Sequence, residues 1–117
     1  MSWLLVLSIS IGGAAGALAR ALAGRWIRTE FPLATLLVNI LGSFLLALTY
    51  TGLSGRAELL NALIGAGFCG AFTTFSTFIL ETIILWRSGQ YRQAVLYLVS
   101  TIALCCLASW LGIHLIN

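Results

Sequence analysis

Four long apolar stretches follow one another along the chain, separated by short polar stretches. The apolar stretches cover roughly residues 3–23, 33–53, 59–86 and 94–116. Each has about the 20 mostly apolar residues that a helix needs to cross a bilayer. The pattern therefore predicts an all-α integral membrane protein with four transmembrane helices, which together form a single domain over residues 1–117.

The composition leaves no stretch of the chain for a soluble domain. Of the 117 residues, 61% are hydrophobic and 8% are charged, which is far from the average of soluble domains. The three cysteines all fall in apolar stretches and favour free thiols over a disulfide framework. Gly12 and Gly16 lie four residues apart, so they share a helix face that can pack closely. Such small residues also favour self-association.

The arginines favour one side of the membrane. Four spans place both termini on the same side and the loops 24–32 and 87–93 on the other side. These two loops carry four arginines: Arg25, Arg28, Arg87 and Arg92. The side of the termini has only Arg56. The positive-inside rule therefore predicts that the two arginine-rich loops are cytoplasmic.

The third apolar stretch contains a run that weakens helices. Residues 67–78 read Gly-Phe-Cys-Gly-Ala-Phe-Thr-Thr-Phe-Ser-Thr-Phe. Hydrocarbon offers no water to satisfy backbone groups that leave a helix, so irregular backbone survives at this depth only inside protein or beside a polar cavity. The run therefore predicts a break in the third helix, at the functional centre of the molecule.

Polar side chains recur every four residues in the second and fourth stretches, so each series follows one helix face. The two series are Thr35, Asn39 and Ser43, and Tyr97, Thr101 and Cys105. Asn39 stands out because its amide offers two donors and an acceptor. Polar residues inside a membrane are functional candidates by default. Both series are also compatible with ordinary packing, in which Asn39 joins two helices and the hydroxyls bond their own helix.

Aromatic and acidic residues follow the predicted break. Phe75, Phe78 and Glu81 are spaced three residues apart. The edge of an aromatic ring is positive and can attract a dehydrated anion, although most phenylalanines in membranes simply pack. Glu81 is compatible with a protonated donor, a relay group, a carboxylate beside a polar cavity or a group near the membrane surface.

The remaining polar and charged groups of the spans favour anions over cations. The first two spans contain no carboxylate, and Arg20 ends a small-residue run in the first. Arg20 either extends to the membrane surface or draws anions into a vestibule. Amide, hydroxyl, ring-edge and guanidinium groups all suit an anion.

Three motifs carry a resemblance to a known family. They are Gly12-Gly13-x-x-Gly16-Ala17-x-x-Arg20, Val38-Asn39-x-x-Gly42-Ser43-Phe44, and the run at 67–78. The first two are moderately specific, whereas Thr-Thr-Phe-Ser-Thr-Phe after a glycine-rich lead is rare in membrane proteins. In order, spacing and chain length they resemble the Fluc (CrcB) family of bacterial fluoride channels. The resemblance covers essentially the whole chain. It implies a passive fluoride-selective channel that exports fluoride across the bacterial inner membrane. It also implies that the protein is not an enzyme.

The resemblance also implies an assembly and a set of site residues. It implies an antiparallel, dual-topology homodimer with a structural sodium ion, Na+, at the dimer interface. Backbone carbonyls of Gly70 and Thr73 from both subunits are implied to hold this sodium. Arg20 is implied to lie in a vestibule. The implied fluoride pathway comprises Asn39, Phe75, Phe78, Tyr97, Thr101, Glu81, Thr35 and Ser43.

Two residues and the arginine bias depart from the family pattern. Ala71 replaces a usual glycine, and Cys105 stands where a hydroxyl is expected. Dual-topology proteins normally show little charge asymmetry, so an antiparallel pair with a homologue of fixed orientation remains an alternative to the homodimer.

Two other functions remain open from the sequence. A small four-span, proton-coupled exporter of cationic compounds needs a carboxylate in its first span, and no acid occurs between Met1 and Arg28. A non-transporting membrane scaffold predicts uninterrupted helices and no polar path.

Overall fold

The computed structural model describes residues 2–29, 31–52 and 58–116. Within these residues the structure is helical, with four helical spans that are long and apolar enough to cross a membrane. This confirms the predicted number of spans. They are α1 (Trp3–Trp26), α2 (Leu33–Gly52), the segmented third span (Glu58–Arg87) and α6 (Tyr91–Ile116). Arg56, part of the charge argument, lies outside the described residues.

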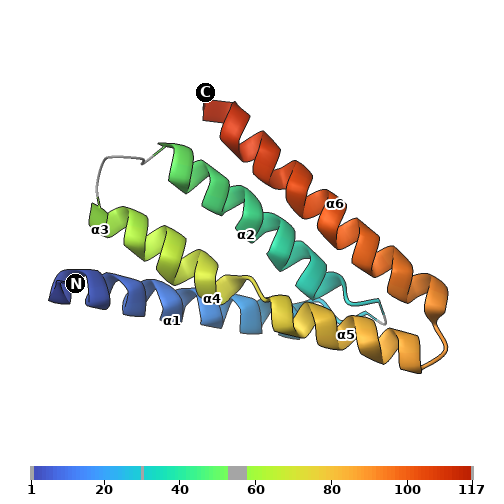
Figure 1. The fold of residues 1–117 in the computed structure, drawn as a ribbon. Coiled ribbons are helices and arrows are strands. Elements are labelled where there is room, and N and C mark those ends of the chain that lie inside the picture. Colours follow the sequence, from blue (N-terminus) through green and yellow to red (C-terminus); the bar gives the residue numbers. More distant parts are fainter. Residues whose placement is uncertain (1, 30, 53–57, 117) are drawn as a thin grey trace.

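The third span is broken as predicted. Its segments are α3 (Glu58–Asn61), the π-helix η1 (Ala62–Cys69), α4 (Gly70–Phe72) and α5 (Phe75–Arg87). Between α4 and α5 the backbone is extended, with φ/ψ of −84°/156° at Thr73 and −150°/118° at Thr74. Gly70 itself is helical. The break therefore lies at the two threonines, after the glycines, as the thin link between α4 and α5 shows in Figure 1.

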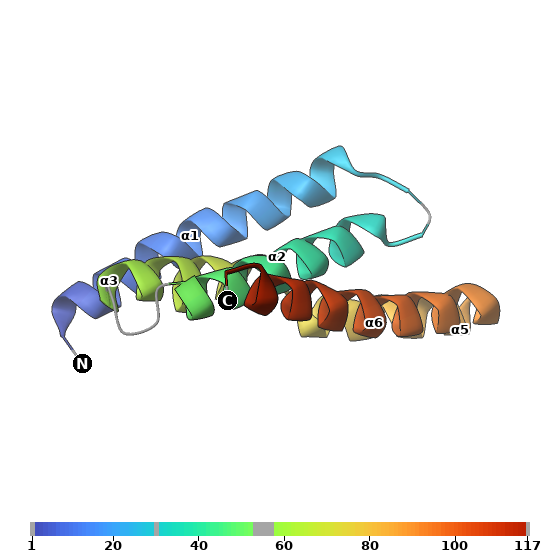
Figure 2. The same ribbon diagram turned by 90° about the horizontal axis from the view of Figure 1, so that it is seen from above.

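The two halves of the third span pack against different helices. Figures 1 and 2 show α3, η1 and α4 lying along α1, whereas α5 contacts α6. The second helix, α2, packs along α6 and also contacts η1. The break therefore faces the middle of α2, which brings Asn39 close to it.

Glycines allow α1 to approach η1 closely. A Cβ atom at Gly12 would overlap the carbonyl oxygen of Leu63, and one at Gly16 would overlap the carbonyl oxygen of Phe68. A Cβ at Gly67, on the η1 side, would lie 2.7 Å from the carbonyl oxygen of Ile9. The predicted close-packing face is thus present. The wider turn of η1 was not predicted; it directs backbone carbonyls toward α1, where only glycine leaves room.

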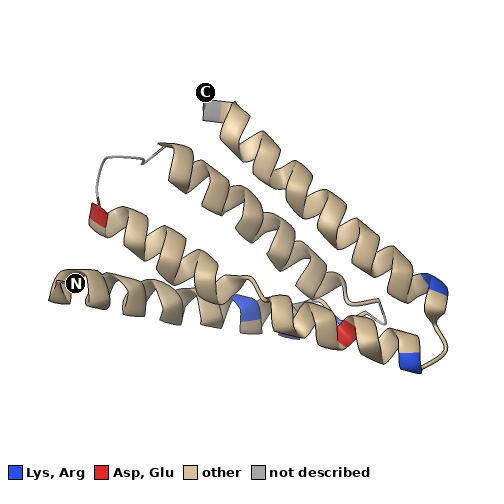
Figure 3. Ribbon diagram, viewed as in Figure 1, with Lys and Arg blue, Asp and Glu red and all other residues tan. Residues whose placement is uncertain are grey.

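Apart from Arg20 within α1 and Glu81 within α5, the charged residues of the described chain lie toward the two ends of the bundle. Arg87 and Arg92 lie where α5 ends and α6 begins, and Glu58 lies at the opposite end (Figure 3). Arg25 lies in the last turn of α1, at the same end as Arg87. The described part of the chain therefore carries its arginines toward one end, as the loop pattern predicted.

Candidate functional site

Asn39 holds the backbone of the helix break. Its Nδ2 donates to the carbonyl oxygen of Thr74 at 3.1 Å, and its Oδ1 accepts from the Thr74 N–H at 2.8 Å. Both residues are 8% exposed. A buried backbone group without a partner costs about 1–3 kcal/mol. These two hydrogen bonds are therefore what makes an extended residue tolerable at membrane depth. The structure thus gives Asn39 the joining role that was one of its two open interpretations.

The threonines close the helix ends on either side of the break. The hydroxyl of Thr73 donates to the carbonyl oxygen of Cys69 at 2.9 Å, in the last turn before the break. The hydroxyl of Thr74 accepts from the N–H of Thr77 at 3.2 Å and forms the N-cap of α5. Threonine suits this position because an N-cap needs a short side chain with an acceptor oxygen.

These bonds release two carbonyl groups. In a continuous helix the Gly70 carbonyl accepts from the N–H of Thr74, and the Thr73 carbonyl accepts from the N–H of Thr77. Here the Thr74 N–H donates to Asn39, and the Thr77 N–H donates to the Thr74 hydroxyl. Gly70 and Thr73, the two residues implied to hold sodium, are therefore among the residues whose carbonyls lose their helical donors at the break.

A cavity of about 350 Å³, the phenylalanine cavity, lies beside the break. Phe75 and Phe78 line it with ring centroids 5.9 Å apart and planes at 60°. Phe78 is 3% exposed and packs edge-to-face on Tyr97, whereas Phe75 is 74% exposed. The wall of the phenylalanine cavity also includes polar and thiol residues of α2 and α6: Asn39, Ser43, Thr101, Cys105 and Cys106.

Thr101 lines this cavity and has a buried, unpaired hydroxyl. The residue is 5% exposed, and its Oγ1 has no hydrogen-bond partner among the described residues. Other threonines in the spans do bond their own helix: Thr49 donates to Leu45 and Thr82 donates to Phe78, each at 2.8 Å. The packing interpretation of the α6 hydroxyls therefore does not fit Thr101.

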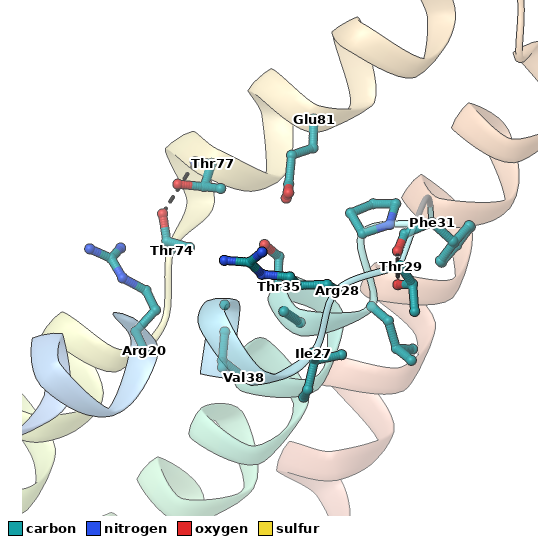
Figure 4. Close-up of a pocket in the computed structure, with 14 residues that line it drawn as sticks. Arg20, Ile27, Arg28, Thr29, Phe31, Thr35, Val38, Thr74, Thr77 and Glu81 are labelled. Carbon is teal, nitrogen blue, oxygen red and sulfur yellow. Dashed lines mark hydrogen bonds between the residues drawn. The ribbon is translucent and has the colours of Figure 1, made fainter. Parts of the chain in front are cut away.

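A larger cavity of about 660 Å³, the arginine cavity, lies on the other side of Thr74. Figure 4 shows Arg20 from α1 beside Thr74, and Arg28 extending between Arg20 and Glu81. Thr35 of α2 lines the same cavity. Because Thr74 lines both cavities, the arginine and phenylalanine cavities adjoin at the break.

Half-buried Glu81, which lines the arginine cavity, forms a polar pair with buried Tyr97. The Tyr97 hydroxyl donates to Glu81 Oε1 at 3.0 Å, and Tyr97 is completely buried. Tyr97 also contacts Phe31 and Phe78 edge-on. Glu81 is therefore hydrogen-bonded within the protein at the arginine cavity.

The structure divides the residues of the implied pathway into groups. The phenylalanine cavity includes Asn39, Ser43, Phe75, Phe78 and Thr101. The arginine cavity includes Arg20, Thr35 and Glu81. Tyr97 lines neither cavity and reaches the arginine cavity only through Glu81. Gly70 and Thr73 line a third space of about 540 Å³, the Gly70 cavity.

Two site residues were missed in the sequence analysis. Arg28 was treated as a loop charge, and nothing in its spacing from Arg20 indicates that both line one cavity. Thr74 was treated as part of a weak helical run. The spacing Thr74-x-x-Thr77, an N-cap threonine three residues before a helical N–H, is a signal for its role.

The described residues contain no cluster of side chains that are typical metal ligands. No group of three or more His, Cys, Asp or Glu side chains is placed to hold a metal ion within residues 2–29, 31–52 and 58–116. A cation at the break therefore has backbone and hydroxyl oxygens as its available ligands. Such oxygens suit a hard cation.

Comparisons with known proteins agree with the motifs. Residues 7–113 match the model of the family described as CrcB-like protein, Camphor Resistance (CrcB). The chain is 44% identical over 111 residues to Fluoride-specific ion channel FluC 1 of Geobacillus kaustophilus, covering 92% of this chain and 94% of that one. It is 46% identical over 111 residues to Fluoride-specific ion channel FluC of Acidobacterium capsulatum, covering 89% of each.

Proposed function

This chain belongs to the CrcB family, and from that membership we propose that it is a multi-pass membrane channel selective for fluoride. The observation that carries the proposal is the phenylalanine cavity, which is lined by two phenylalanine rings and by Thr101, whose buried hydroxyl is unpaired among the described residues. A channel needs no bond-making step, so the protein acts as a transporter and not as an enzyme. The broken third span and the polar cavities also argue against a scaffold of uninterrupted helices.

The order of the cavities suggests the course of the ion. Arg20 and Arg28 raise the local concentration of anions in the arginine cavity. Past Thr74, fluoride exchanges water for the Thr101 hydroxyl and the ring edges of Phe75 and Phe78. The Asn39 amide has two N–H groups and Thr74 uses one, so the second is available as a donor to fluoride.

The arginines also suggest a direction. The positive-inside rule places the arginine end of one copy on the cytoplasmic side, so the arginine cavity of that copy opens toward the cytoplasm, whereas that of an inverted second copy opens to the opposite side. Fluoride then leaves the bacterial cell through the inner membrane, passively and down its electrochemical gradient. Glu81 does not favour a proton-coupled cation exporter, because Tyr97 donates to its carboxylate and two arginines share its cavity.

An antiparallel dimer completes the site in this proposal. Phe75 is 74% exposed beside the cavity, and an inverted second copy covers it. The carbonyls of Gly70 and Thr73, released from helical bonds, bind a structural sodium ion together with the same carbonyls of the second copy. Two copies supply four oxygens, the kind of ligand that a hard cation prefers. The arginine asymmetry leaves a paired homologue as the alternative second subunit.

We expect purified protein in liposomes to release fluoride without any other component. A fluoride electrode measures the efflux, with a potassium ionophore to balance the charge. Chloride-loaded liposomes are the matched comparison and should show efflux at least about 100-fold slower, which corresponds to about 2.7 kcal/mol of barrier difference. Equal chloride efflux, or no fluoride efflux, contradicts the proposed function.

Replacing sodium with N-methyl-D-glucamine is expected to weaken the dimer and lower fluoride flux. The carbonyls of Gly70 and Thr73 then have no small hard cation to bind and face one another unpaired. Size-exclusion chromatography and flux, measured after exhaustive removal of sodium, test this expectation. Full flux and an unchanged dimer without sodium contradict the site. Restoring sodium to the same sample is the control for irreversible damage.

A further inference from the structure

The phenylalanine cavity carries two thiols that the proposed pathway does not use. Cys105 and Cys106 are consecutive residues of α6, and both line this cavity. Cys105 is half-buried and lies next to the Ser43 hydroxyl of α2, whereas Cys106 is exposed. Thr101, one turn earlier in α6, lines the same cavity. It is 5% exposed, and its hydroxyl is buried and unpaired among the described residues.

These thiols differ chemically from everything else on that wall. The other polar groups of the cavity are hydroxyls and one amide, which are hard ligands. Thiolates select soft metal ions. The third cysteine, Cys69, is 1% exposed and lines the Gly70 cavity instead. The two neighbouring thiols thus form a pair that is separate from it.

We propose that Cys105 and Cys106 form a dithiol site for a soft, thiophilic metal ion on the wall of the phenylalanine cavity. Consecutive helical residues differ by about 100° around the axis, yet both of these side chains line the same cavity, so a metal ion held in that cavity contacts both sulfur atoms. A hydroxyl in place of Cys105 makes a poor ligand for such an ion. The site is therefore specific to this pair of residues.

Mercury(II) illustrates the binding step. One equivalent of HgCl2 exchanges its first chloride for the Cys105 sulfur and its second for the Cys106 sulfur. Each exchange breaks a Hg–Cl bond, forms a Hg–S bond, and releases the thiol proton and a chloride ion to solvent. No oxidant is needed, because mercury and sulfur keep their oxidation states.

The consequence for transport rests on the proposed fluoride channel. A metal held by these thiols occupies the 350 Å³ cavity beside Phe75, Phe78 and Thr101. It removes the space in which fluoride meets its donors. Bound metal therefore blocks the pathway, and a dithiol competitor that removes the metal reopens it.

The binding test counts free thiols on the purified full-length protein, unfolded and assayed after adding one equivalent of HgCl2 per chain. We expect the wild type to lose two thiols per mercury. Cys105→Ser and Cys106→Ser should each lose one, and the matched control Cys69→Ser should still lose two. Loss of one thiol in the wild type, or a two-thiol loss that depends on Cys69, overturns the site.

The transport test uses the same four proteins in liposomes, each compared with its own flux before mercury. We expect wild type and Cys69→Ser to lose at least nine-tenths of their fluoride flux, with recovery after dimercaptopropanol. Cys105→Ser and Cys106→Ser hold mercury by a single Hg–S bond, so their flux should recover at a lower dose of dimercaptopropanol than that of the wild type. Two thiols bound without a loss of flux overturn the block. A wild type that never conducts fluoride refutes the channel and leaves the thiol count to decide the metal site.

Discussion

Replacing Phe75 with isoleucine is expected to abolish fluoride flux while the protein still folds and dimerises. Phe75 is 74% exposed within its own chain and lines the phenylalanine cavity. Isoleucine keeps an apolar surface but has no positive ring edge to replace the water that fluoride gives up. We expect flux below about a hundredth of wild type, which corresponds to a barrier raised by about 2.7 kcal/mol. Fluoride efflux from liposomes and size-exclusion chromatography measure the two parts of this prediction.

Two further phenylalanine variants separate the role of the ring from packing. Phe78→Ile is also expected to abolish flux, but Phe78 is 3% exposed and packs on Tyr97, so stability falls as well. Phe72 stacks on Phe68 with ring centroids 5.2 Å apart, and it is absent from the wall of the phenylalanine cavity. Phe72→Ile is therefore the matched control and should retain flux. Wild-type flux in Phe75→Ile means that its ring only packs.

Replacing Asn39 with alanine is expected to destabilise the break more than any other change to the polar faces. The substitution leaves the N–H and the carbonyl of Thr74 without their partner. Each buried, unpaired group costs about 1–3 kcal/mol, so we expect a loss of roughly 2–6 kcal/mol in stability. The melting temperature of the purified dimer in detergent measures this effect. Ser43→Ala, on the same face and the same cavity, is the control with a small expected effect.

The Asn39→Ala variant also tests the link between the helix break and sodium binding. Without Asn39, the Thr74 N–H is free to bond the Gly70 carbonyl and extend α4. The carbonyl is then lost to the cation, so the dependence of the dimer on sodium should weaken in Asn39→Ala. Asn39→Asp keeps an acceptor for the Thr74 N–H and should preserve more of this dependence. An alanine variant with wild-type stability and sodium dependence contradicts the role assigned to Asn39.

Much of the architecture follows from local features of the chain. Runs of apolar residues are long enough to cross a bilayer whatever they pack against, so four spans could be predicted without a structure. The break could be predicted because Gly, Thr and Ser weaken a helix at any site. Gly12 and Gly16 share a face because helical periodicity alone places them there.

The exact place of the break was decided by tertiary contacts. The run at 67–78 predicted a break without placing it on particular residues, and the chain leaves the helix at Thr73 and Thr74. The reason is that Asn39, 35 residues earlier, pairs with both the N–H and the carbonyl of one residue, Thr74. No local preference of the run contains that information.

The sequence by itself determined the spans, their approximate limits, the presence of a break and the chemical types of the site residues, since each depends on the residues themselves or on their spacing along one helix. Only the tertiary structure decided which of them meet. Glu81 and Tyr97 are 16 residues apart and form a pair, and Arg28 joins Arg20 in one cavity. Such contacts depend on how helices are rotated and shifted against one another, and close packing in three dimensions sets that arrangement.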